Sequence, residues 1–272
     1  VVTFQSGGAA ITDTSITYAN TGNVHTAKYT ANTLDTAGSV TYSIAFSDSA
    51  GNAGTAVTSG SGSVTFDKTA PTMTITAAEV NDGDTSNDST LSLTFTSSEA
   101  TSDFVKTDIT VNGGSLGDLS GSGTTYTATF TPTASGATTI DVASGAFTDT
   151  AGNNNTAATQ FNWTYDGTAP TISSVSLNSD NNALTVTFSE NAYDTNGGSG
   201  DLEAADFTLS ISGGSATLNS ATPTSIAKTS QSVWVLGFST SGTANGSETI
   251  TVVPASSTSI YDAAANAAAT SQ

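Results

Sequence analysis

FDKTAPTMT at Phe66–Thr74 and YDGTAPTIS at Tyr165–Ser173 are two copies of one short motif in a chain of 272 residues. The copies begin at positions 66 and 165, so the repeat is 99 residues long. A period of this length with a proline-containing seam is typical of small all-β domains joined in tandem. The motif therefore predicts a rod of three domains, over residues 1–69, 70–168 and 169–272.

The composition is strongly acidic and excludes several classes of partner. The chain has 23 Asp and Glu against 4 lysines, no arginine and a formal charge of −19. Such a surface repels phosphate groups, so we expect no binding to nucleic acid or anionic lipid. Charged residues are nevertheless only 10% and hydrophobic ones 36%, which is enough to form packed cores. No hydrophobic run approaches the roughly 18–20 residues that a membrane span needs, so direct membrane insertion is not expected.

Short runs of alternating apolar and polar residues recur along the chain. Leu91–Phe95, Tyr126–Phe130 and Leu184–Phe188 each place apolar side chains on one face and threonine or serine on the other. This period of two is that of half-buried β-strands. Glycine-rich clusters such as Asn112–Gly114 and Asn196–Gly198 mark turns between them. The pattern predicts an all-β fold of antiparallel sandwiches.

The two terminal domains lack strands that the central domain has. The third follows the central one through Tyr261–Asn266, the equivalent of Phe147–Asn153, but has no counterpart of the strand at Gln160–Tyr165. The first has no counterpart of Met73–Ser97. Either the sequence is part of a longer chain, or neighbouring subunits supply the missing strands, with Val1–Phe4 as a candidate donor.

The sequence resembles the tandem bacterial immunoglobulin-like (Big-type) repeats of large extracellular adhesins and surface fibre proteins. The motifs that carry the resemblance are the Asp-x-Thr-Ala-Pro seam, Phe95–Glu99, Asp108–Gly114, Tyr126–Pro132 and Phe147–Asn153. The third domain departs from the pattern at Ala265, where glycine is usual. The resemblance implies a rod of Ig-like sandwiches, often stiffened by calcium, that serves adhesion, biofilm formation or surface extension.

Acidic residues of each domain are expected to gather at its N-terminal end. Successive loops of an antiparallel sandwich alternate between its ends, so the linker, the loop after the second strand and the loop before the last strand should meet. The candidate metal ligands are Asp67, Glu99, Asp108 and Asp149 in the central domain and Asp166, Glu190, Asp206 and Asp262 in the third. Close carboxylates do not all stay ionised without a cation, and Ca²⁺ takes six to eight oxygen ligands. Structural calcium is therefore expected, with solvated or backbone-capping acids as the alternative.

A further acidic loop, at residues 81–88, belongs to the opposite end of the central domain, facing the third. Asp82, Asp84 and Asp88 resemble part of a calcium loop, although the spacing is not that of an EF-hand. A solvated acidic turn is the alternative interpretation.

The sequence offers no catalytic constellation. His25 is the only histidine, and its match to Tyr126 predicts a core-facing position. Neither a Ser-His-Asp set nor a zinc site can be assembled, and the acids cluster at domain ends instead of across a cleft. We therefore expect a protein that is not an enzyme.

These observations lead to the expectation of a structural stalk or fibre segment at the bacterial cell surface or outside the cell. Its partners would be neighbouring domains or identical subunits, with cell-surface glycans or proteins as further ligands. Two alternatives stay open. One is a self-assembling filament subunit completed by strands of its neighbours, and the other is a glycan- or protein-binding module that uses the long loop Asn191–Asp206.

Overall fold

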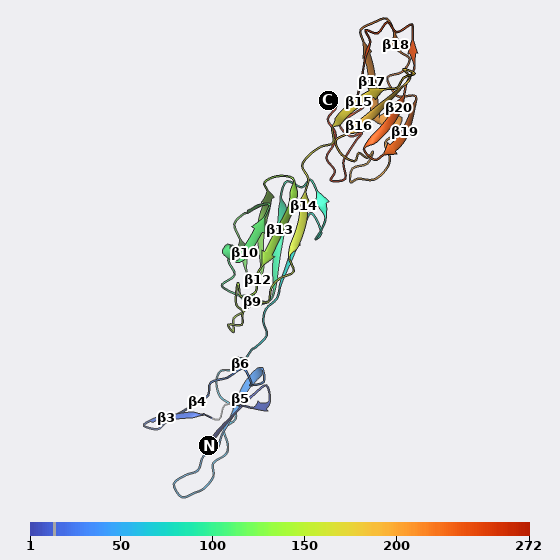
Figure 1. The fold of residues 1–272 in the computed structure, drawn as a ribbon. Coiled ribbons are helices and arrows are strands. Elements are labelled where there is room, and N and C mark those ends of the chain that lie inside the picture. Colours follow the sequence, from blue (N-terminus) through green and yellow to red (C-terminus); the bar gives the residue numbers. More distant parts are fainter. Residues whose placement is uncertain (13–14) are drawn as a thin grey trace.

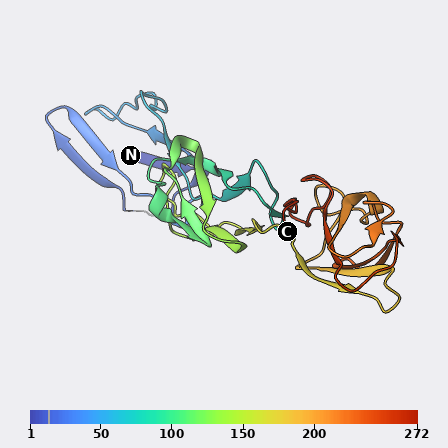
Figure 2. The ribbon, with the colours of Figure 1, turned by 90° about the horizontal axis from the view of Figure 1, so that it is seen from above.

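The computed structural model describes residues 1–12 and 15–272 and confirms the all-β prediction. Three units, β1–β6, β7–β14 and β15–β22, follow one another along an elongated molecule (Figure 1). Among the described residues, every paired strand finds its partners within its own unit. Figure 2 shows the same row of units from above, with the hairpin β3–β4 standing away from the rest.

The second unit is a sandwich of two four-stranded, mainly antiparallel sheets. Its strands are β7 (Met73–Ala77), β8 (Thr85–Ser86), β9 (Leu91–Thr101), β10 (Ile109–Asn112), β11 (Gly114–Leu116), β12 (Ser120–Pro132), β13 (Gly136–Val142) and β14 (Phe161–Tyr165), with a 3₁₀ turn, η1, at Lys106–Asp108. One sheet has the order β11-β12-β9-β7, and the other β10-β13-β14-β8, where only the β14–β8 pair is parallel.

The core of this unit follows from the alternation of its strands. Leu91, Leu93 and Phe95 of β9 are fully buried, and the residues between them point outward. Phe130 of β12 contacts Trp163 of β14 edge to face, with ring centroids 6.2 Å apart, which joins the two sheets. Hydrophobic packing between the sheets therefore fixes the scaffold from which the loops at each end project.

The third unit repeats this plan with fewer strands in its second sheet. Its strands are β15 (Ile172–Leu177), β16 (Ala183–Phe188), β17 (Phe207–Ser212), β18 (Thr217–Leu218), β19 (Ser225–Ser230), β20 (Val233–Gly237), β21 (Thr240–Ser241) and β22 (Thr249–Pro254), with a 3₁₀ turn, η2, at Ala204–Asp206. One sheet runs β15-β16-β20-β19, and two-stranded sheets pair β17 with β22 and β18 with β21. Trp234 of β20 is 1% exposed and anchors the core of this unit.

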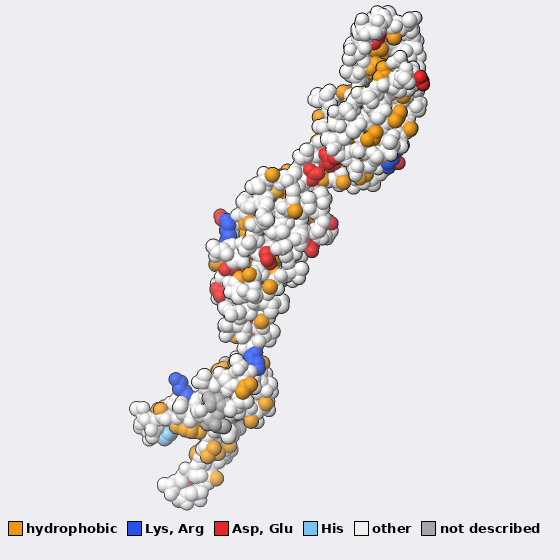
Figure 3. Space-filling model, viewed as in Figure 1, with side chains coloured by type: hydrophobic (Ala, Val, Ile, Leu, Met, Phe, Trp, Pro, Cys, Tyr) orange, Lys and Arg blue, Asp and Glu red, His pale blue; other side chains and the backbone are white. Residues whose placement is uncertain are grey.

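The first unit is an open half-sandwich. It contains β1 (Val2–Ser6), β2 (Ala9–Ala10), β3 (Thr17–Thr21), β4 (Val24–Lys28), β5 (Gly38–Ile44) and β6 (Val64–Phe66). Among the described residues, the sheet β2-β1-β5-β6 and the hairpin β3–β4 form separate sheets, and hydrophobic side chains are visible on the surface of this unit (Figure 3).

Two expectations about this unit are wrong. Val1–Phe4 is not available as a donor strand, because Val2–Ser6 pairs along its own β5 and also with β2. His25 is exposed in β4 and does not face a core. Its hairpin pairs with no further strand among the described residues, so the face that Tyr126 buries in the second unit stays open here.

Within the described ranges, no helix has the length and apolar character needed to cross a membrane.

Candidate metal centres at the domain junctions

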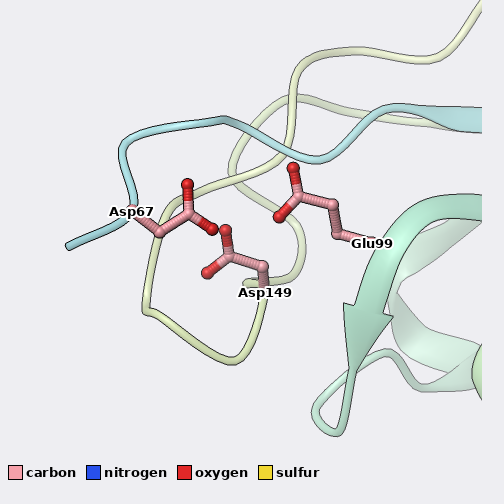
Figure 4. Close-up of side chains that lie close together, drawn as sticks. All are labelled: Asp67, Glu99 and Asp149. Atoms are coloured by element: carbon pink, nitrogen blue, oxygen red, sulfur yellow. The ribbon is translucent and has the colours of Figure 1, made fainter. Parts of the chain in front are cut away.

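Three carboxylates meet where the chain enters the second unit. Asp67 follows β6 in the linker, Glu99 lies near the end of β9, and Asp149 lies in the turn after β13. One carboxylate oxygen of each lies within 4.8 Å of those of the other two. The side chains point toward one another from three separate segments (Figure 4). The alternation of loop ends thus brings together residues that are 82 positions apart in the sequence, from Asp67 to Asp149.

The turn that carries Asp149 is held by the carboxylate itself. Asp149 is 5% exposed, and its Oδ1 accepts the backbone N–H groups of Ala151 (2.8 Å) and Asn153 (2.9 Å). Asn153 Nδ2 donates both to Asp149 Oδ2, at 2.9 Å, and to the backbone oxygen of Asp67, at 3.3 Å. The Asn153 amide therefore joins the buried turn to the linker that carries Asp67.

An equivalent cluster lies where the chain enters the third unit. Asp166, Glu190 and Asp262 also place carboxylate oxygens within 4.8 Å of one another, and Asp262 is 1% exposed. Asn266 Nδ2 donates to Asp262 Oδ2 and to the backbone oxygen of Asp166, both at 2.8 Å. Acidic side chains gather at this junction on the molecular surface (Figure 3). The two junctions therefore share the same arrangement of three carboxylates and one bridging asparagine amide.

Backbone pairing holds the linker against the strand that carries the glutamate. Thr72 N–H donates to Ser98 Oγ (2.9 Å), and Ser98 N–H donates to the Thr72 oxygen (2.9 Å). At the second junction Thr171 and Ser189 exchange the same two bonds, at 3.0 and 2.8 Å. Each glutamate directly follows this serine, so its backbone position is fixed relative to the linker aspartate.

In each cluster, the glutamate is the residue whose pKa is raised by its surroundings. Burial, followed by the charges of Asp67 and Asp149, raises the pKa of Glu99. Burial, followed by the charges of Asp262 and Asp166, raises the pKa of Glu190. A raised pKa in the folded state means that stability is present below the ordinary pKa of glutamate and is lost as the pH rises through the raised value. At neutral pH, the carboxylates of each cluster are therefore held close together against their mutual repulsion.

Burial also acts on Asp149, but hydrogen bonds outweigh it. The side chain and backbone of Asn153 donate to the Asp149 carboxylate and lower its pKa. Asp149 therefore stays ionised beside Glu99 and supplies a fixed negative charge.

Two predicted ligands, Asp108 and Asp206, do not join these groups. Asp108 ends the turn η1, where its Oδ2 accepts Val105 N–H at 2.8 Å. Asp206 ends η2, where its Oδ2 accepts Glu203 N–H at 2.7 Å. Neither belongs to the carboxylate groups found at the junctions, because each carboxylate caps the 3₁₀ turn that leads into the next strand. The expectation that they complete the clusters is wrong.

The loop with Asp82, Asp84 and Asp88 lies at the end of the second unit that faces the third, where Asp166 N–H donates to the Ser86 oxygen at 3.0 Å. Each of its carboxylates has a local hydrogen-bonding role. Asp82 Oδ1 accepts Asn162 N–H (2.6 Å), Asp84 Oδ2 accepts Asn81 N–H (2.8 Å) and Asp88 Oδ2 accepts the Ser86 hydroxyl (2.7 Å). The three are not among the carboxylate groups that converge in the described residues. The contacts favour a structural turn at this loop.

The junctions differ in how the linker contacts the preceding unit. Lys68 Nζ donates to the backbone oxygens of Thr33 and Asp35 in the first unit, each at 2.9 Å. At the equivalent position, Gly167 has no side chain, and its N–H donates to Ser135 Oγ at 2.9 Å. The first linker is thus tied to the unit before it by a long charged side chain, and the second by a serine hydroxyl.

Sequence reasoning missed Asn153 and Asn266, whose side-chain amides join each turn to its linker. The signal was present as Asp-x-x-x-Asn, at Asp149–Asn153 and Asp262–Asn266. The first unit has the same turn, in which Asp48 Oδ2 accepts Asn52 Nδ2 at 2.8 Å. There, however, both residues are exposed.

Comparison with known proteins identifies the middle of the chain. Residues 67–165 match the bacterial Ig-like domain family. The match confirms the resemblance for this segment, which runs from Asp67 to the last residue of β14. Domains of this family are non-catalytic and structural, and they typically occur in extracellular or surface proteins. No curated protein matches the chain.

Proposed function

From the bacterial Ig-like domain at residues 67–165, we propose that the chain is a stalk segment of an extracellular bacterial surface protein, with calcium-stiffened junctions. It would span distance from the cell and support adhesion or surface extension without catalysis. The elongated row of units supports this role, because end-to-end domains with short linkers convert chain length into reach (Figure 1).

The observation that carries the proposal is the repetition of one carboxylate cluster at both junctions. In each cluster, one carboxylate comes from the linker and one from a turn whose aspartate is buried. The third is the glutamate, which lies within β9 at the first junction and just after β16 at the second. The repetition of this geometry together with the same bridging asparagine supports a site that ties the linker to its domain.

The donor set fits calcium by chemistry and by size. Carboxylates are hard oxygen ligands, and a Ca²⁺–oxygen distance of 2.3–2.6 Å places oxygens on opposite sides of one ion about 4.6–5.2 Å apart. The cluster oxygens lie within 4.8 Å of one another. Asp67, Glu99 and Asp149 would hold the ion at the first junction, and Asp166, Glu190 and Asp262 would hold it at the second. The ion would supply charge neutralisation and a crosslink between three segments.

The expected effect of one ion is modest for a domain but large for a joint. Extracellular modules bind calcium at roughly 0.1–1 mM. At about 1 mM free calcium and a Kd near 0.1 mM, each site contributes about 1.4 kcal/mol. That free energy is enough to shift a flexible linker about tenfold toward one orientation.

Small-angle scattering of the chain with calcium and with chelator tests this function. With calcium, the radius of gyration and the maximum dimension should both increase, and the distribution of conformations should be narrower. The double variant Glu99→Gln/Glu190→Gln should lose the response. The control Asp118→Asn/Asp180→Asn, with the same change of charge at exposed positions, should keep it. If the unmodified chain scatters identically in calcium and in chelator, the junctions are not stiffened by the ion.

A further inference from the structure

The basic residues of the chain are few, and one of them lies between two units. The sequence has four lysines and no arginine. Lys28 lies in β4, Lys106 in η1 and Lys228 in β19, whereas Lys68 lies in the linker between β6 and β7. Here a single stretch of chain joins the first two units (Figure 1). Both Lys68 and the following residue, Thr69, are exposed.

The backbone of Lys68 is less restrained than that of the other lysines. Among the described residues, neither its N–H nor its carbonyl oxygen makes a hydrogen bond. The Lys106 carbonyl accepts the Ile109 N–H, and Lys28 and Lys228 are paired within antiparallel strands. Exposure and backbone hydrogen bonding decide where a protease cuts a folded chain, and both favour the bond after Lys68.

The residues after Lys68 favour an extended conformation. Ala70 precedes Pro71, and the proline ring disfavours the helical region for the residue before it. A serine protease of the trypsin class binds its substrate as an extended chain and takes a lysine side chain into an acidic pocket. The linker therefore has both the conformation and the side chain that such an enzyme recognises.

Two contacts hold this linker in the structure. Lys68 Nζ donates to the backbone oxygens of Thr33 and Asp35, each at 2.9 Å, so it must leave them to enter a protease pocket. Asp67, one residue earlier, belongs to the first carboxylate cluster. A cation in that cluster would hold Asp67 in place and slow the opening of the linker. This calcium dependence rests on the proposed function, whereas accessibility of the bond does not.

We propose that the Lys68–Thr69 bond is a processing site at which a trypsin-class serine protease separates the first unit from the second. Hydrolysis adds one water across this bond and leaves a carboxylate on Lys68 and an amine on Thr69. Because Asp67 stays with the first unit, the cut also divides the first cluster. The second seam has the same Asp-x-Thr-Ala-Pro motif but carries Gly167 in place of lysine, so it resists this class of enzyme.

Limited digestion of the 272-residue chain with trypsin, followed by mass spectrometry of the intact fragments, tests the site. The first products should end at Lys68 and begin at Thr69. Lys68→Gln should abolish this cut, and the matched variant Lys28→Gln should leave it unchanged. Tryptophan emission checks that both variants are folded. A first cut after Lys28, Lys106 or Lys228 would overturn the proposal.

A lysine introduced at the second seam tests whether the seam itself defines the site. The three atoms nearest to a Cβ added at Gly167 belong to the outer end of the Tyr165 side chain, which can move. Gly167→Lys should therefore create a second early cut, before Thr168. Thr127→Lys, at an exposed position of the paired strand β12, should not. If Gly167→Lys adds no cut, the assignment of the site to the seam is wrong.

Calcium should slow the cut after Lys68 about tenfold relative to chelator, at about 1 mM calcium and a Kd near 0.1 mM. A short chromogenic lysine peptide in the same buffers corrects for any effect of calcium on the protease. Glu99→Gln should remove the difference between the two conditions. Equal rates with the first cut still after Lys68 would support the processing site and contradict the calcium function, so the two failures are distinguishable.

Discussion

Exchanging glycine and alanine between two equivalent turns should change the stability of their domains in opposite directions. Gly152 and Ala265 occupy the same place in the turns that carry Asp149 and Asp262, and both have positive φ, 92° and 77°. Glycine adopts this region without penalty, whereas alanine is strained there. Ala265→Gly should therefore stabilise the third unit, and Gly152→Ala should destabilise the second.

The magnitude follows from the geometry of the turn. A Cβ added at Gly152 meets no atom within 4 Å, so steric clash adds nothing and backbone strain decides the cost. That strain is roughly 1–2 kcal/mol, and the lower entropy of alanine in the unfolded chain returns about 0.4–1 kcal/mol. The net change should be about 0.8 kcal/mol in each direction, the midpoint of a range of about 0–1.6 kcal/mol. For a domain of this size the midpoint corresponds to a shift in Tm of about 3–6 °C.

The two tryptophans allow each domain to be observed separately. Trp163 is buried in the second unit and Trp234 in the third, and the chain has no other tryptophan. Urea unfolding followed by fluorescence in a Trp234→Phe background reports on the second unit, and in a Trp163→Phe background on the third. Comparing each turn variant with its own background removes the cost of the tryptophan replacement.

The control for this prediction is Ala263→Gly in the same turn. Ala263 is exposed and is not among the positive-φ residues of the described chain, so glycine there should only add unfolded-state entropy and lower stability. If Ala265→Gly lowers the free energy of unfolding as Ala263→Gly does, strain at Ala265 is not the reason for the difference.

Three further predictions concern single side chains. Backbone N–H donors, Ser215 first, lower the pKa of Glu248 to about 2, so stability of the third unit should be lost as the pH falls from about 4.5 toward 2, and Glu248→Gln should flatten this dependence in thermal melts. Lys68→Ala should increase motion at the first junction in NMR relaxation with or without calcium, whereas Lys28→Ala should not; equal effects would argue against the linker contact. Asn153→Ala should lower the free energy of unfolding of the second unit by about 1.5–3 kcal/mol, measured by fluorescence, because it leaves a buried carboxylate short of a donor; a loss below about 0.5 kcal/mol would contradict this role.

The convergence of Asp67, Glu99 and Asp149 could be predicted because it depends only on which end of a sandwich each loop occupies. Strand periodicity and the repeated seam are sufficient for that, and the same rule placed the loop at residues 81–88 beside the third unit. Side-chain detail within the loops does not follow from this rule.

The predictions that failed depend on local turns and on neighbouring strands, which the sequence of a short segment does not reveal. Asp108 and Asp206 directly precede strands and were predicted to join the clusters. A 3₁₀ turn forms at each position instead, and the carboxylate caps it. His25 matches a core position by sequence alignment, and its exposure depends on the opposing strands, which local sequence does not reveal.

The three carboxylates of each cluster and their bridging asparagine lie within one repeat of the sequence. Asp67, Glu99, Asp149 and the bridging Asn153 fall inside residues 67–165, the segment that matches the family. Duplication of this one segment therefore copies the carboxylate cluster together with its domain. A lineage can lengthen or shorten such a rod by whole repeats, and the spacing of the clusters along the rod is inherited with the repeat.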